Sequence, residues 1–310
     1  MRQHLLLEDR PSARVLPIEI RDVHEAGALG FMPRMFVLAT LPHSQTKANQ
    51  FERVNGRYSL RLEARRSIGL PYGIYPRLIL AYLTTKAIRT KSREIELGRT
   101  PNDFARRLGL SPISGKRGNV RRLQEQLERL LTTRLSWRYS KDFRTQESGC
   151  CLITARDLTL EGLRAKLRRR RRTWNPTLVL SRQFFQEISR SVVPVELRAI
   201  EHLKGSPLAT DIYIWLTYRM SYLRRPCTIP WQALENQFGS NYSRSRDFRR
   251  SFCAHLRSVV GVYPAVRLRQ MDTGLLLYPS PPHVQARPNK DVQGSFGHLA
   301  SGRSKVQRVR

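Results

Sequence analysis

One order of secondary-structure elements, predicted twice along the chain, constrains the fold more than any other feature of the sequence. Each predicted unit contains a helix, a short strand, a second helix, a turn, a third helix and a two-stranded hairpin. In the first unit, apolar periodicity and turn residues place these elements at about 75–90, 94–97, 101–109, 119–132, 135–139 and 150–154. In the second unit they fall at about 208–223, 227–229, 230–239, a helix including 248–259, 265–269 and 275–278.

The second helix of each unit is bounded by the same two residue types. Pro101 and Gly109 lie eight positions apart, and Pro230 and Gly239 lie nine apart. Proline suits the first turn of a helix, and glycine suits its C-terminal end. The element order is that of a winged helix, a variant of the helix-turn-helix. We therefore expect an α+β fold, mainly helical, made of two tandem winged-helix domains with short β-hairpin wings.

Two further strand signals precede the first unit. Phe36–Ala39 is expected to be a strand. Asn55-Gly56 separates Phe51–Val54 from the alternating Tyr58–Leu62, and Asn-Gly supplies the positive φ angles of a tight turn. An N-terminal β-hairpin is therefore expected. Changes in composition then divide the chain into a poorly ordered lead-in (1–30), a first winged-helix domain with the hairpin (31–157), a basic linker (158–176), a second winged-helix domain (177–281) and a disordered basic tail (282–310).

The charge balance indicates the class of ligand. The chain has 56 Lys and Arg against 24 Asp and Glu, a net charge of +32 at neutral pH, and a polyanion would relieve this self-repulsion. Hydrophobic residues make up 40% of the chain, which is enough for packed cores. The longest apolar stretches, such as Leu78–Leu83, are too short to span a membrane, and the N-terminus lacks a signal-peptide pattern. We expect a folded nucleic-acid-binding protein of the cytoplasm, with reduced cysteines.

The third helix of each unit is the expected recognition helix, because this helix enters the major groove in a helix-turn-helix. Its apolar stripe faces the domain, so the opposite face and the N-terminal end are free to meet DNA. Arginine can bind guanine, and asparagine adenine, through two hydrogen bonds; the alternative for each residue is a solvated helix face. The candidate DNA-binding residues are Lys116, Arg117, Asn119, Arg121, Arg122 and Arg129 in the first unit and Asn241, Ser243, Arg244, Arg246, Arg249 and Arg250 in the second.

A run of five consecutive arginines follows the first unit: Arg168, Arg169, Arg170, Arg171 and Arg172. Five like charges cannot pack together without anions, so the run is expected to be an exposed arm or helix end that contacts phosphates or lies in a narrow minor groove. The alternative is a solvated linker that does not touch DNA.

Signatures of enzymes are missing from the sequence. Gly109–Lys116 departs from a phosphate-binding loop, because five residues rather than four separate its glycines and Arg117 replaces the magnesium-binding hydroxyl residue. The seven histidines form no metal-binding pair, and the four cysteines form no CxxC. We expect no catalytic residues, no metal and no cofactor. A nucleic-acid enzyme such as a relaxase or primase is a third hypothesis, which nicking or primer synthesis would reveal.

Several blocks resemble the plasmid-encoded RepA replication-initiator family over about Phe31 to Ser280: residues 68–73, 76–85, 89–98, 104–110, 178–188 and 211–219. The resemblance implies a bacterial tandem winged-helix protein that binds repeated sites at a plasmid origin, helps to open the adjacent duplex and recruits the host helicase and polymerase. The helices after Gly109 and Gly239 would be the two recognition helices. It leaves open a homodimer as the autorepressing form, and it assigns no role to the arginine run.

An alternative function from another class fits the same fold. A winged-helix transcriptional repressor would bind an inverted repeat as a symmetric dimer without melting DNA, and it could repress its own gene. Direct repeats beside an A·T-rich stretch would favour the initiator, whereas one palindrome over a promoter would favour the repressor.

Overall fold

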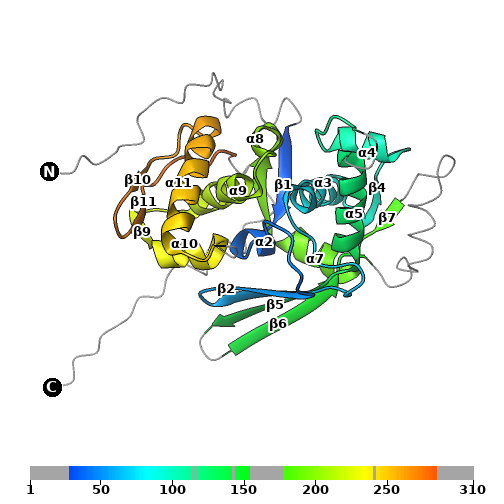
Figure 1. Cartoon of the computed structure of the whole chain (residues 1–310), viewed down its shortest axis with the longest axis horizontal. Helices are drawn as coiled ribbons and strands as arrows, with labels where there is room; N and C mark the ends of the chain where they lie inside the picture. The colour runs from blue at the N-terminus through cyan, green and yellow to red at the C-terminus, as the bar shows by residue number, and fades with distance from the viewer. Residues whose placement is uncertain are drawn as a thin grey trace.

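The computed structural model describes residues 28–113, 115, 118–141, 144–153, 177–239 and 242–284. Over these residues the protein is a mixed α/β fold with small antiparallel sheets. Figure 1 shows two groups of helices on either side of β1 and β8, with a larger sheet along one edge of the molecule.

The first unit has the element order that the sequence predicts. The Thr100 hydroxyl accepts a hydrogen bond from the Asp103 N–H, and Pro101 occupies the first turn of α4, so this helix begins where expected. The second strand of the wing begins before the expected 150–154 and pairs with its partner along its whole length. The elements are α3 (Ile74–Thr90), β4 (Glu94–Glu96), α4 (Pro101–Arg107), α5 (Asn119–Thr132), β5 (Arg134–Lys141) and β6 (Arg144–Cys151).

The predicted N-terminal hairpin is confirmed. Strands β2 (Gln50–Asn55) and β3 (Tyr58–Glu63) pair around Gly56, whose φ is 57°. Because β3 also pairs with β5, the N-terminal hairpin and the β5–β6 pair form one four-stranded sheet in the order β2-β3-β5-β6.

The strand expected at Phe36–Ala39 is wrong, because a short helix, α2 (Arg34–Leu38), lies there. Met35, Phe36 and Val37 are all buried. A strand would direct such neighbours to opposite faces, whereas a helix end wedged into a core can bury all three. Burial outweighs the strand preference of the individual side chains.

The second unit also has the expected order. The Ser206 hydroxyl caps its first long helix by accepting the Ala209 N–H at 3.2 Å. Its three-stranded sheet has the order β10-β11-β9. The elements are α8 (Leu197–Leu203), α9 (Pro207–Tyr222), β9 (Cys227–Pro230), α10 (Trp231–Phe238), α11 (Ser245–Val262), β10 (Leu268–Gln270) and β11 (Gly274–Leu277).

Two strand pairs cross the expected domain boundaries. Strand β1 (Leu29–Pro33) pairs with β8 (Val192–Glu196), and β7 (Thr177–Val179) pairs with β4 of the first unit. Helix α7 (Arg182–Arg190) packs against α3 and β6. The expected boundaries at residues 30 and 177 therefore do not coincide with breaks in packing, because these short strands satisfy their backbone groups with partners far away in the sequence.

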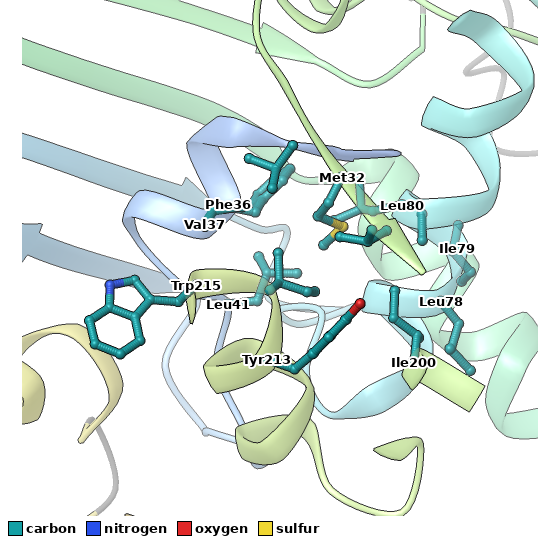
Figure 2. Packing of buried hydrophobic residues seen from close by; sticks show 14 of the residues in the cluster. Met32, Phe36, Val37, Leu41, Leu78, Ile79, Leu80, Ile200, Tyr213 and Trp215 are labelled. Carbon is teal, nitrogen blue, oxygen red and sulfur yellow. The ribbon is translucent and has the colours of Figure 1, made fainter. Parts of the chain in front are cut away.

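A shared apolar core joins the two halves. Figure 2 shows Met32, Phe36, Val37 and Leu41 of the N-terminal segment packed between the two long helices. Helix α3 contributes Leu78, Ile79 and Leu80, and the second half contributes Ile200, Tyr213 and Trp215. The two units are thus parts of one packed body.

A buried ion cluster lies beside this core. Arg77 of α3 donates two hydrogen bonds to Asp211 of α9, Nε to Oδ1 at 2.8 Å and Nη2 to Oδ2 at 2.6 Å. His43 Nε2 lies 2.8 Å from the same Oδ2. Burial alone would raise the pKa of the Asp211 carboxyl, but the charge of Arg77 and the His43 hydrogen bond outweigh burial and hold the pKa below its usual value. Burial lowers the pKa of His43.

The end of the second unit extends further than the sequence predicts. His283 and Val284, assigned to a basic tail that begins at 282, are buried. The Tyr213 hydroxyl lies 2.8 Å from His283 Nδ1, and the Tyr263 ring lies over the imidazole. This contact could not be predicted from the sequence, because His283 and Val284 are only two residues in a segment (282–310) whose composition is basic.

Candidate nucleic-acid interface

The apolar stripes of α5 and α11 face the core, as the helical period predicts. The buried residues of α5 include Val120, Leu123, Leu127, Leu130 and Leu131, and those of α11 include Phe248, Phe252, Leu256 and Val259. Figure 1 shows α5 and α11 separated along the longest axis of the molecule and running in opposite directions, α5 away from α4 and α11 away from α10. The opposite faces of both helices are exposed.

The first turn of α5 presents two exposed arginines. Arg121 forms an ion pair with Glu125 one turn later, with 3.0 Å between Nε and Oε1. Arg122 is exposed, and the described residues offer it no polar partner. Because an exposed i,i+4 pair contributes little energy, Arg121 can exchange Glu125 for an anion.

The Asn119 side chain forms hydrogen bonds within the turn before α5, whereas the sequence predicts that it contacts a base. Its Oδ1 accepts the Ile113 N–H at 2.8 Å, and its Nδ2 donates to the Ser111 carbonyl at 2.6 Å. The side chain therefore points back into the turn and fixes the path of the chain into the helix.

Arg129 is also held by the protein, so the sequence-based expectation that it faces outward is wrong. Its Nη1 donates to the Leu70 carbonyl at 3.1 Å, and its guanidinium lies 5.3 Å from the centre of the Tyr72 ring. The neighbouring Gln126 is buried and accepts the Tyr72 N–H. The C-terminal half of α5 thus packs on the 69–72 loop, which leaves the N-terminal half as the exposed basic part.

In the second unit, the exposed candidates gather at the start of α11. Ser243, Arg244 and Arg246 are exposed. Arg250 is 85% exposed at its side chain, and its Nη2 lies 3.7 Å from Asp247. These residues are free to meet a ligand.

Arg249 ties three parts of the second unit together. Its guanidinium lies 5.2 Å from the centre of the Trp231 ring of α10, and its Nη2 donates to the Asp272 carbonyl in the β10–β11 turn at 3.1 Å. Arg249 therefore positions the wing against α11 and α10, and we assign it a supporting role rather than base recognition.

Each half of the molecule also contacts the end of the second helix of the other unit, α10 in one case and α4 in the other. In the second unit, Arg53 of β2 donates from Nη1 to the Asn236 carbonyl at 3.1 Å, and the Thr40 hydroxyl donates to the Gln237 carbonyl at 3.0 Å. Both carbonyls lie in the last turn of α10, where a cation is favoured. Burial lowers the pKa of Arg53 to about 10, so the guanidinium stays charged at neutral pH.

The reciprocal contact lies at the turn after α4. Lys204, between α8 and α9, donates from Nζ to the Gly109 carbonyl, and it also lies 3.3 Å from Glu201. Gly109 has a φ of 69°, and the Glu201 carboxylate packs against it. We call these contacts the reciprocal braces: Arg53 and Thr40 with the carbonyls of the last turn of α10, and Lys204 with the Gly109 carbonyl after α4.

Four of the sites predicted from the sequence lie outside the described residues: Lys116, Arg117, Asn241 and the run Arg168–Arg172. The sequence does not predict the reciprocal braces, because no local pattern distinguishes Arg53 or Lys204 from the other basic residues.

The comparisons with known proteins assign the family. The family described as "Plasmid encoded RepA protein" matches residues 70–232, more than half of the chain. The chain belongs to this family. The match spans α3 to the start of α10, so in this RepA-family chain α4 and α5 lie inside the matched segment and α11 lies outside it.

A solved structure shares the fold of the RepA-family chain. The crystal structure of domain 2 and domain 3 of RctB has a TM-score of 0.50 and 11% sequence identity, and the alignment covers 82% of this chain and 99% of that chain. At this identity the likeness concerns the fold alone. No curated protein sequence matches the chain. Among the described helices, none is long and apolar enough to cross a membrane.

Proposed function

We propose that this chain is a plasmid replication initiator that binds repeated double-stranded DNA sites in the plasmid origin. One observation carries the proposal: the same order of helix, strand, helix, turn, helix and hairpin occurs twice, with exposed arginines at the start of α5 and of α11. Each unit is a winged helix in this proposal, and α5 and α11 enter neighbouring stretches of major groove.

The charge of the chain supports a DNA ligand. A net charge of +32 favours association with a polyanion, and the exposed side chains of Arg122, Arg246 and Arg250 can contact phosphates or guanines. The proposed activity is binding without covalent chemistry, and it takes place on plasmid DNA in the bacterial cytoplasm.

The two units present different surfaces to a duplex. The turn before α5 exposes Ile113, whereas in the turn before α11 the Tyr242 ring packs on Phe248 and its hydroxyl bonds to Ser251. One chain therefore reads two different half-sites, and each copy of an asymmetric repeat would bind one chain. Opening of the adjacent duplex and recruitment of host replication proteins complete the proposed role.

The test begins with a footprint of the purified protein on its own plasmid, together with selection of bound sites from random duplexes. Protection that recurs over direct repeats beside an A·T-rich stretch is the expected result. Protection of one palindrome over a promoter would instead favour a repressor, and no selected sequence at all would overturn the proposal.

Two variants test the interface itself. Arg122→Ala and Arg246→Ala should each cost roughly 1–3 kcal/mol of binding free energy at the selected site and relax the preference for one base. Arg257→Ala is a matched control, because Arg257 is exposed on α11 but lies about three turns from its start. Equal losses for all three variants on selected and random duplexes would reduce these arginines to general phosphate contacts.

A further inference from the structure

Ile113 has an unusual position in the turn before α5. Its side chain is 61% exposed, the largest exposed fraction among the exposed large hydrophobic residues of the described chain. Such exposure of a branched apolar side chain is unfavourable in water, and isolated cases on a surface need no special explanation. The backbone around Ile113 supplies the reason to consider it further.

The main chain of Ile113 is held at both ends. Its N–H donates to Asn119 Oδ1 at 2.8 Å, and its carbonyl accepts the Val120 N–H at 3.4 Å. Asn119 in turn donates to the Ser111 carbonyl. These bonds join the backbone of Ile113 to the first turn of α5, so the position of this exposed residue is fixed relative to the start of the helix.

The neighbouring side chains define the surroundings. Arg121 and Arg122 are exposed on the same first turn of α5, so Ile113 is an apolar group at the edge of a basic surface. In a major groove that such arginines enter, the apolar feature of a base edge is the 5-methyl group of thymine. Burial of an isoleucine side chain against this methyl would remove both from water.

We propose that Ile113 contacts the 5-methyl group of a thymine in the half-site read by the first unit, and that it thereby determines specificity at that position. This inference rests on the proposed function, and it adds a residue that acts through apolar contact beside the arginines. Asn119 is the residue that positions it.

The experiment removes the methyl group alone. Each thymine of the selected site is replaced in turn by uracil, which keeps base pairing and lacks only the 5-methyl group. The wild-type protein should lose affinity by about fourfold at one thymine of the first half-site, the effect expected for one buried methyl group.

Ile113→Ala tests whether this residue makes the contact. The variant should bind the thymine site more weakly than the wild type does, and the uracil replacement should cause it no further loss. Ile113→Val should retain most of the sensitivity to uracil. Val54→Ala is the control, because Val54 is also exposed, at 54%, but lies on β2 of the four-stranded sheet; it should keep the wild-type response.

Two outcomes would overturn the inference while the proposed function stands. One is an Ile113→Ala variant that remains as sensitive to uracil as the wild type. The other is an Ile113→Ala variant with full DNA affinity that fails to replicate the plasmid, which would assign the residue to a protein partner. Failure of the proposed function has a different signature, because the wild type would then select no sequence.

Discussion

His43 is a titratable residue at the junction between the halves, where it contacts Asp211 of α9. It is buried beside Asp211, with the charges of Arg77 and Arg53 nearby, and burial lowers its pKa below the ordinary 6.5. The unfolded chain therefore binds a proton more readily than the folded chain does. Acidification through pH 6.5 consequently favours unfolding, and this contribution to stability is fully present only above that pH.

We expect the free energy of unfolding to fall between pH 7.5 and pH 5.5, and to fall less in His43→Gln. Glutamine can still donate a hydrogen bond to Asp211 but does not titrate. Denaturant unfolding of both proteins at the two pH values measures the difference. The same pH dependence in both proteins would show that His43 is not the group responsible.

Arg129 and Arg122 lie on the same helix, but replacing them is expected to have different effects, on stability for Arg129 and on DNA sequence preference for Arg122. Arg129→Ala removes the hydrogen bond to Leu70 and the stacking on Tyr72. It should lower the free energy of unfolding by about 1–2 kcal/mol and leave the preferred DNA sequence unchanged. Arg122→Ala should leave stability nearly unchanged and alter the sequence preference. Thermal unfolding and site selection on both variants separate the two roles, and exchanged results would contradict our assignment.

The periodicity of the sequence predicts which way these residues point relative to their own helix axis. It therefore identifies the buried stripe of α5 and the exposure of Arg122 correctly. It contains no information on the 69–72 loop that packs on the far end of α5, or on the turn that Asn119 completes. The contacts of Arg129 and Asn119 depend on chain segments that the helical period cannot describe.

At the scale of elements, α3 and α9 are joined by the ion pair between Arg77 and Asp211, whose side chains are 1% and 5% exposed. Arg77→Met should destabilise the protein by about 3–5 kcal/mol, because it leaves the Asp211 carboxylate buried without its main partner. The double variant Arg77→Met with Asp211→Leu should recover part of this loss. Denaturant unfolding measures both, and a double variant no more stable than Arg77→Met would contradict the explanation.

The order of elements was predictable because caps, prolines and glycines act locally. Thr100 with Pro101 and Ser206 with Pro207 fix the starts of two helices through neighbours within three residues. The pairing of β1 with β8 joins segments more than 150 residues apart, and no local pattern specifies it. The same limit explains why α2 was expected to be a strand.

At the scale of the whole molecule, the reciprocal braces connect the two units. Arg53 holds the end of α10 and Lys204 holds the turn after α4, each from the other half of the chain. Together with the shared core, they fix the separation and relative angle of α5 and α11. The proposed DNA site should therefore tolerate changes in sequence between its half-sites better than changes in their spacing.

Insertion of one base pair between the half-sites rotates one relative to the other by roughly 35°. Wild-type affinity should then fall by about tenfold or more, because the DNA must deform to meet both helices. The double variant Arg53→Met with Lys204→Met should show a smaller penalty for the insertion. Binding to sites with spacers one base pair shorter and longer measures this, and an unchanged spacing profile would show that the braces do not set the separation.

Because the shared core and the reciprocal braces join the two halves, DNA rather than the protein would change shape when the two bind. In the proposed complex, Arg53 and Lys204 hold α5 and α11 in one frame, so any mismatch between that frame and straight B-form DNA would become torsion and curvature in the double helix. Several such chains on consecutive repeats would add their distortions in the same sense. The strain would then be released most easily where base pairs are weakest, in an A·T-rich segment beside the array.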